Sequence, residues 1–514
     1  MNDVRILIVD DEEKWRTSLP DLLLKRLDPR LKIEIANDYA TALQKVKSNS
    51  YDLVSLDFDL LGDINSAVNP NFQGMDLLKE CRSSTRNRTC GLLVLSGRAT
   101  PAAVFKALEK YEINVFLDKH DFLDGEPYLR AVKDAIRRAR FQQSERQLKD
   151  RYQLTVTYDQ NGLARGDLVG PNHRSEALVN SHHSSITELD DLARRADNLN
   201  QRLNSGEEGV WRLEARSIGS AMYSTLVSQQ QISSLLSTAR TLVADKGSSL
   251  SLQFSGPPYC LSVPCELIRD DDYLALTYLL TRRLSQGGPR FTMKSQPFFK
   301  FVEKQIEKDE PLRVLLVGAN VDARLPAIET EVLQLADSIR SDLELLGISH
   351  QITTLLGGDV TYHKLSETLL DGQHIFHFAG HGNFDESLPE KSPLVLRDRD
   401  LTAADVQLLT QGTDLQFVFL SCCLAARTGR QVGRGDFHGF LHALSQADVP
   451  AALAYRWEVE DASALVLAQS FYEFLWRSLS LSQALLSSRR KLARGPDGRD
   501  NETWAAPVLL SQTS

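Results

Sequence analysis

The chain contains few cysteines, no long apolar run and no basic stripe, and each absence excludes a class of protein. Six cysteines scattered over 514 residues do not form the disulfide framework of a secreted protein. The start, MNDVRILIVDDEE, lacks the basic residues and long apolar core of a signal peptide, and no apolar run approaches the roughly 18 residues that span a bilayer. A net charge of -9 argues against a nucleic-acid partner. We expect a cytoplasmic protein with no membrane and no nucleic-acid partner.

The length and the hydrophobic pattern predict several α/β units. At about 150 residues per domain, 514 residues suggest three. Residues 4–140 alternate five short β-branched runs with five amphipathic stretches, which is typical of a doubly wound, five-stranded parallel sheet. The alternation returns after residue 312. The fold class is therefore α/β.

Charged and polar residues stand at the ends of the predicted strands in the first 140 residues. Asp10 and Asp11 end the first strand, Asp57 the third and Ser96 the fourth, and Lys119 follows the fifth. These ends converge in a parallel sheet. Three neighbouring carboxylates repel one another unless a hard cation or an ammonium lies among them, so the pattern predicts bound Mg²⁺ beside Lys119. A carboxylate in such a site is a candidate phosphoryl acceptor.

On these residues the segment 1–140 resembles the receiver domain of two-component response regulators. The resemblance implies that a sensor histidine kinase is the partner and that Asp57, in DLVSLDFDL, is the phosphoacceptor. It assigns the metal site to Asp10, Asp11, Asp57 and the backbone carbonyl of Asp59, and the phosphorylation switch to Ser96, Lys119 and Phe116. One departure is His120, which replaces the proline that follows the lysine in the family.

A second pattern appears in HFAGHGN, residues 377–383, and FLSCCLA, residues 419–425. If HIFHFA and LQFVFL form neighbouring parallel strands, His381 and Cys423 lie at the same edge of the sheet. A nearby imidazole can take the proton of a thiol and raise its nucleophilicity. The backbone N–H groups of Gly382 and Cys423 could then stabilise the oxyanion of a tetrahedral intermediate.

Three other interpretations compete for these residues. His381 could be an ordinary turn histidine, and Cys422 and Cys423 could be buried core residues, since free cysteine is among the most buried residue types. His374, His377 and His381 could also bind zinc with the cysteines. Zinc is disfavoured because the vicinal cysteines are not a C-x-x-C motif.

The sequence around both stretches resembles the CHAT family of caspase-like cysteine peptidases from about residue 205 to the end. VPCELI at 263–268 is similar to a segment of the pseudo-caspase half that precedes the peptidase in that family. The resemblance assigns Cys423 as nucleophile, Cys422 as its inward-facing neighbour, and His381 and Gly382 as catalytic partners. Together the two resemblances predict a receiver at 1–140, a helical linker and connecting segment at 141–205, the pseudo-caspase half at 206–305 and the peptidase at 306–514.

The same resemblance suggests where the substrate binds. Trp457, Glu458 and Asp461 would line the pocket, and an acidic pocket prefers arginine or lysine. These acids could instead cap the helix that starts near Asp461.

Together these features predict a cysteine endopeptidase that cleaves a protein substrate, needs no cofactor of its own, and is regulated by phosphorylation of Asp57. Phosphorylation would rearrange the linker or the oligomeric state. The family suggests stress response, programmed death or bacterial defence. The alternative is an inactive caspase-like scaffold switched by the receiver. A transcriptional regulator would need a basic helix-turn-helix, which the carboxyl half does not contain.

Overall fold

The computed structural model describes two compact units, one formed by Met1–Arg146 with Ser341–Ser349 and the other by Gln147–Arg340 with His350–Ser514. The residues that it describes are 4–58, 60, 73–97, 105, 108–121, 125–159, 163–171, 175–183, 191–196, 199, 208–227, 230–257, 263–284, 296–320, 327–383, 388, 391–422, 429–430, 437–495 and 502–512.

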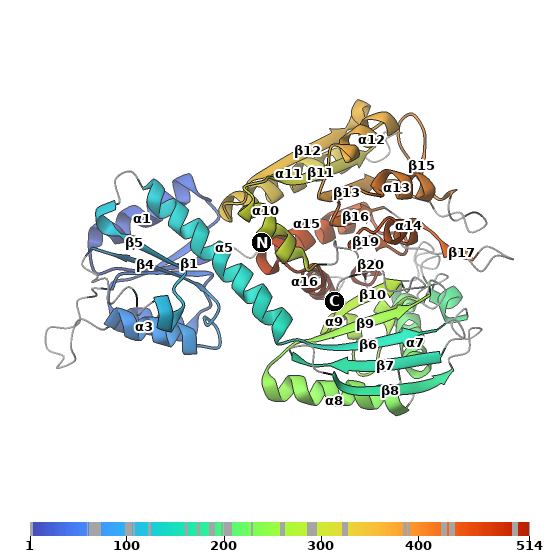
Figure 1. The fold of residues 1–514 in the computed structure, drawn as a ribbon, viewed down its shortest axis with the longest axis horizontal. Coiled ribbons are helices and arrows are strands. Elements are labelled where there is room, and N and C mark those ends of the chain that lie inside the picture. The colour runs from blue at the N-terminus through green and yellow to red at the C-terminus, as the bar shows by residue number, and fades with distance from the viewer. Residues whose placement is uncertain are drawn as a thin grey trace. The chain divides into compact units, whose positions relative to one another are not determined.

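The first unit contains a five-stranded sheet in the order β2-β1-β3-β4-β5, and every neighbouring pair is parallel. The strands are β1 (Arg5–Val9), β2 (Lys32–Ala36), β3 (Leu53–Leu56), β4 (Gly91–Ser96) and β5 (Val115–Asp118). The helices are α1 (Glu13–Arg26), α2 (Tyr39–Ser48), α3 (Gln73–Ser83) and α5 (Glu126–Lys149) (Figure 1). The predicted parallel sheet is confirmed, in the flavodoxin-like order that places sites at the carboxyl ends of the strands.

The strands β3 and β4 of this unit are apolar because both faces of the sheet are covered there. All four residues of β3 and all six of β4 are buried, as expected for parallel strands under helices on both sides. β3 and β4 contain no charged residue, and Asp57 follows directly after β3.

The second unit contains an eleven-stranded sheet in the order β12-β11-β13-β16-β19-β20-β10-β9-β6-β7-β8. Figure 1 shows these strands following one another as a single sheet. The strands after residue 311 in this sheet are β11 (Leu312–Ala319), β12 (His350–Leu356), β13 (Ile375–Gly380), β16 (Phe417–Ser421), β19 (Ala451–Tyr455) and β20 (Pro507–Ser511). The remaining strands are β6 (Tyr152–Tyr158), β7 (Leu163–Val169), β8 (Ser175–His183), β9 (Leu250–Gly256) and β10 (Leu279–Leu284).

Helices and short strands complete this unit. The helices are α7 (Glu208–Leu226), α8 (Gln230–Lys246), α9 (Leu274–Thr277), α10 (Phe298–Glu307), α11 (Ala327–Leu345), α12 (Tyr362–Leu370), α13 (Ala403–Thr410), α14 (Phe440–Gln446), α15 (Asp461–Ser478) and α16 (Leu481–Ala493). The short strands are β14 (Pro393–Leu394), β15 (Leu401–Thr402), β17 (Gly429–Arg430) and β18 (Phe437–His438).

The segment 141–205, expected as a helical linker and connecting segment, contributes β6, β7 and β8 to the sheet. Its beginning is helical, because α5 runs on to Lys149, and residues 191–196 are helical as well. In β7, LARGDLV, the residues alternate between exposed or half-buried and buried. Charged residues and a glycine weaken the apolar run by which such a strand is recognised in sequence.

A buried ionic group joins the two parts of the large sheet. Glu266 is fully buried and contacts the guanidinium groups of Arg282 on β10 and Arg489 on α16, which are 3% and 1% exposed. Burial lowers the pKa of Arg489 to about 10, although the charge of Glu266 opposes the shift. Because α16 packs against β10, the ionic group holds the carboxyl-terminal helix to a strand of the preceding part.

Candidate functional site

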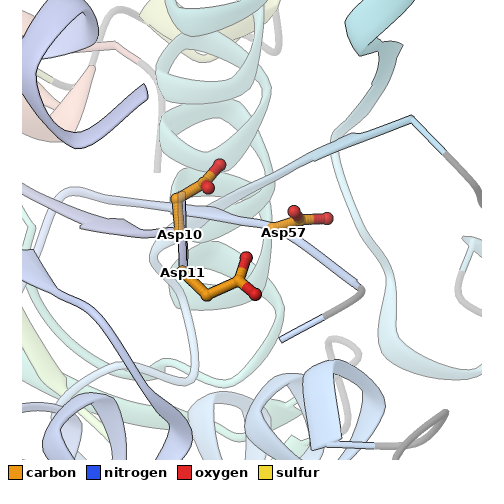
Figure 2. A group of neighbouring side chains, drawn as sticks. All are labelled: Asp10, Asp11 and Asp57. Carbon is orange, nitrogen blue, oxygen red and sulfur yellow. The ribbon is translucent and has the colours of Figure 1, made fainter. Parts of the chain in front are cut away.

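The acidic cluster lies at the carboxyl ends of β1 and β3. Asp10, Asp11 and Asp57 each offer a carboxylate oxygen, and these oxygens all lie within 4.8 Å of one another. Figure 2 shows the three side chains together at this edge of the sheet. Asp10 is 2% and Asp57 4% exposed, whereas Asp11 is half-buried. Three oxygen ligands so close together suit a hard divalent cation.

Lys119 follows β5 and lies against the same carboxylates. Its Nζ is 2.7 Å from Asp57, 2.9 Å from Asp10 and 3.1 Å from Glu12. Burial opposes the charge of Lys119, but the hydrogen bonds to Asp57 and Asp10 outweigh burial and raise its pKa. Burial raises the pKa of Asp10 to about 6 despite the bond to Lys119. The ammonium thus balances part of the negative charge.

The remaining predicted receiver residues surround this cluster. Ser96 ends β4 and is 1% exposed, and Phe116 in β5 is partly buried against the core. Asp59 lies outside the described residues. His120 places its Nε2 3.2 Å from the backbone oxygen of Gly97, next to Ser96. Glu12, which directly follows the acidic pair, is a partner of Lys119 that was not predicted from sequence.

The second candidate site lies where β13 and β16 end. The two strands are parallel, and their register pairs Ile375 with Phe417 and Ala379 with Ser421, a constant difference of 42 positions (417 − 375 and 421 − 379). His381 follows β13 and is half-buried, and Cys422 follows β16 and is 3% exposed. Cys423 lies outside the described residues.

The backbone around His381 is held by β14. The N–H of Val395 donates to the oxygen of His381 at 3.1 Å, and the N–H of Asn383 donates to the oxygen of Pro393 at 3.0 Å. Gly382 and Leu394 are opposite one another in this antiparallel bridge. The loop that carries His381 and Gly382 is therefore fixed on both sides of the glycine.

The two other histidines of this strand do not share a site with His381. His377 is fully buried, its Nδ1 lies 3.3 Å from the hydroxyl of Tyr472, and burial lowers its pKa to about 3. His374 precedes β13 and accepts a hydrogen bond from the N–H of Arg313. The six residues of β13 separate His374 from His381, which places their Cα atoms about 20 Å apart. Among the described residues, only the acidic cluster gathers three metal-ligand side chains.

The predicted pocket residues differ in exposure. Trp457 is 2% exposed, whereas Glu458 and Asp461 are exposed. Glu460 is the N-cap of α15 without a side-chain hydrogen bond, and Asp461 lies in the first turn, where the helix dipole favours a negative charge. The pocket and capping interpretations both remain predictions.

One buried carboxyl group, that of Glu331, is not among the site residues predicted from sequence. Glu331 on α11 is 5% exposed, and its Oε1 has no hydrogen-bond partner among the described residues. Burial, followed by the charge of Asp461, raises the pKa of Glu331 to about 7. Glu331 adjoins the apolar face of its helix, and nothing in the sequence pattern distinguishes it from a surface acid.

The fold and the first site define the class of the amino-terminal unit. A parallel sheet in the order 2-1-3-4-5, with three carboxylates and a lysine at its carboxyl edge, is the arrangement expected for the receiver domains of response regulators. The CHAT domain model matches residues 215–512, more than half of the chain. The chain therefore belongs to the CHAT domain family, which is of the caspase-like cysteine-protease type.

Solved structures similar to the chain include three receivers. The signal receiver domain of an HD domain-containing protein from Pseudomonas fluorescens Pf-5 is 24% identical, with 27% of this chain and 98% of that chain covered and a TM-score of 0.22. A CheY-like receiver from Methanospirillum hungatei JF-1 is 19% identical, with coverages of 27% and 97% and a TM-score of 0.23. The response regulator TrrA from Thermotoga maritima, in complex with Mg(2+)-BeF, is 21% identical, with coverages of 25% and 96% and a TM-score of 0.19.

No curated protein matches the chain. Every helix in the described part of the chain is too short or too polar to cross a membrane.

Proposed function

We propose that the protein is a cysteine endopeptidase in which His381 and Cys423 form the catalytic dyad and phosphorylation of Asp57 regulates cleavage of a protein substrate. The observation that carries the proposal is the register of β13 and β16, whose constant difference of 42 positions equals the difference between residues 381 and 423. If this register continues for two residues beyond Ser421, Cys423 comes opposite His381. Neighbouring strands are about 4.8 Å apart, so their side chains would meet.

The chemistry follows from these groups. His381 takes the proton of the Cys423 thiol, and the sulfur attacks the carbonyl carbon of the scissile peptide bond. The C–S bond forms as the C=O π bond opens, and the N–H of Gly382 stabilises the negative oxygen. The imidazolium then protonates the leaving amine, and water hydrolyses the thioester. This dyad requires no metal or cofactor.

The receiver half of the proposal rests on the acidic cluster. Asp10, Asp11 and Asp57, with the backbone carbonyl of Asp59, would hold Mg²⁺, which supplies positive charge for phosphoryl transfer from a sensor histidine kinase. Phosphorylation adds charge and acceptor oxygens, so Lys119 and Ser96 would bind the phosphoryl group. Phe116 would turn inward, and α5, which leads to β6 at Tyr152, would carry the change onward or alter the oligomeric state.

A thiol-reactive peptide probe tests the dyad. We expect acetyl phosphate to change its rate of labelling, and we expect Asp57→Asn to abolish that response. Cys423→Ala should abolish labelling, His381→Ala should slow it strongly, and Cys422→Ala should leave it unchanged. Labelling that is lost with Cys422→Ala and kept with Cys423→Ala would overturn the assignment. No labelling of the wild-type chain under any condition would instead support the scaffold alternative.

The acidic residues near α15 lead to a proposal about specificity. Glu458 and Asp461 are exposed and follow the strand next to β16, so they would attract arginine or lysine in the substrate. Probes that differ only in the residue before the scissile bond test this preference. A preference for an acidic residue there would contradict it.

A further inference from the structure

The backbone of β13 presents alternate residues to its two neighbouring strands. The oxygen of His374, just before β13, accepts from the N–H of Phe417 at 3.2 Å and begins the ladder to β16, in which Ile375 is paired with Phe417. The N–H of His374 itself, by contrast, donates to the oxygen of Arg313 on β11. Rungs of a parallel ladder recur every two residues. The even-numbered residues of β13 therefore direct their amide groups toward β16, and the odd-numbered residues direct theirs toward β11.

The same alternation continues beyond the end of β13. The ladder between β11 and β13 ends with the pair of Ala319 and Gly380. The next odd-numbered groups, the oxygen of His381 and the N–H of Asn383, bond to Val395 and Pro393 instead. β14 thus takes over the hydrogen-bonding edge that β11 leaves, in the antiparallel direction.

This pairing determines the direction of the N–H of Gly382. The two bonds flank the Gly382–Leu394 pair, so it is a non-hydrogen-bonded pair, in which both residues direct their own N–H and C=O groups away from the partner strand. The N–H of Gly382 consequently points away from β14, toward the side on which β16 lies.

We propose that the segment 393–395 is a positioning element for the oxyanion hole. Val395 acts through the hydrogen bond that its N–H donates to the backbone oxygen of His381. This inference rests on the proposed peptidase function. A glycine amide rotates readily because no side chain restricts it. The two bonds around Gly382 hold its N–H on the side where the negative oxygen would form.

The element is itself firmly held. Leu394 is fully buried and pairs with Leu401 of β15. Thr402 and Asp405 then form a reciprocal capping box at the start of α13. The N–H of Ala403, in the first turn, donates to the oxygen of Ser392 at 3.2 Å. The position of β14 is therefore fixed by a helix terminus and by the core.

Val395→Pro in the full-length protein tests the role of the N–H, because proline removes the donor, and Val395→Ala keeps it. Two reactions of Cys423 distinguish positioning from general damage. Binding of a peptide aldehyde forms a tetrahedral adduct with a negative oxygen. Alkylation by iodoacetamide forms a C–S bond, expels iodide and places no charge on a carbonyl oxygen. The aldehyde used is the one that binds the wild-type protein most tightly among peptide aldehydes whose last residue is arginine, aspartate or leucine.

We expect Val395→Pro to weaken aldehyde binding by about 10- to 100-fold, part of the effect of losing an oxyanion donor, with an unchanged alkylation rate. Val395→Ala should match the wild type in both reactions. Asn383→Pro, which removes the other flanking bond, should reproduce the effect. Equal aldehyde binding by a folded Val395→Pro chain, or parallel losses in both reactions for both proline variants, would overturn the positioning role. If the wild-type Cys423 binds no aldehyde, the peptidase proposal itself fails.

Discussion

The substitution Glu331→Gln should make the protein less sensitive to pH. Glu331 is buried, its Oε1 has no hydrogen-bond partner among the described residues, and its pKa is raised from 4.5 to about 7. A carboxyl whose pKa is raised on folding binds its proton more tightly in the folded chain. Ionisation of Glu331 therefore does not affect the free energy of unfolding below about pH 4.5. As the pH rises from about 4.5 to about 7, the free energy of unfolding falls progressively.

The size of the effect follows from the two pKa values. With 4.5 in the unfolded chain and about 7 in the folded one, the free energy of unfolding should fall by about 2.5 kcal/mol between about pH 5 and about pH 8 on account of this group alone. Glutamine has a similar shape and does not ionise, so the variant lacks this contribution. Any packing cost of the amide is the same at both pH values and cancels in the comparison.

Urea denaturation of the wild type and Glu331→Gln at both pH values measures this difference. We expect the variant to gain about 2.5 kcal/mol relative to the wild type on going from about pH 5 to about pH 8. The matched control is Glu329→Gln, which makes the same substitution on the same helix at a less buried position. A relative gain below about 0.5 kcal/mol would show that Glu331 ionises normally, and the reasoning from burial would be wrong.

Three further substitutions test other parts of the structure. Glu266→Ala should destabilise the protein by about 3–5 kcal/mol in urea denaturation, since Arg282 and Arg489 stay buried without their carboxylate; a loss below about 1 kcal/mol would contradict this. Lys119→Ala should tighten Mg²⁺ binding by about tenfold in calorimetry, because the ammonium no longer competes with the metal for the carboxylates; unchanged affinity would refute that competition. Asp57→Asn should prevent the mass increase on treatment with acetyl phosphate, and a persisting increase would place the phosphoryl group elsewhere.

The sequence was most informative where chemistry follows directly from strand order. Asp10 and Asp57 could be placed together in advance because parallel strands bring their carboxyl ends to one edge, and the alternation of strands and helices identified such a sheet. The same reasoning applies to His381, because the run before it and the run before Cys422 are both mainly apolar and are six and five residues long.

Other parts of the structure have no comparable signal in the sequence. The bonds from β14 to the loop around Gly382 join segments that lie about a dozen residues apart and show no periodic pattern. The burial of Glu331 depends on which helix covers it, and helical periodicity specifies only a face. The strands β7 and β8 are edge or near-edge strands whose pairing, rather than their composition, makes them strands.

The choice between the two adjacent cysteines depends on which face of the sheet each side chain occupies. Phe417 and Phe419 on β16 contact Phe471 of α15, and His377 on β13 contacts Tyr472 of the same helix. Odd-numbered side chains of both strands therefore face α15. Adjacent residues of a strand point to opposite faces.

Cys422 is even-numbered and buried, so its thiol lies on the face of the sheet away from α15. The odd-numbered side chains of β13, whose alternation leads to His381, lie on the face toward α15. If the alternation continues for one residue, Cys423 joins the same face as His381, and the register brings the two opposite one another. The pH dependence of alkylation can distinguish the two thiols. A thiol beside an imidazole should react with iodoacetamide well below the ordinary thiol pKa of about 8.5. A buried thiol on the opposite face should react slowly at every pH, and rapid alkylation of Cys422 instead would show that the strand alternation breaks at its end.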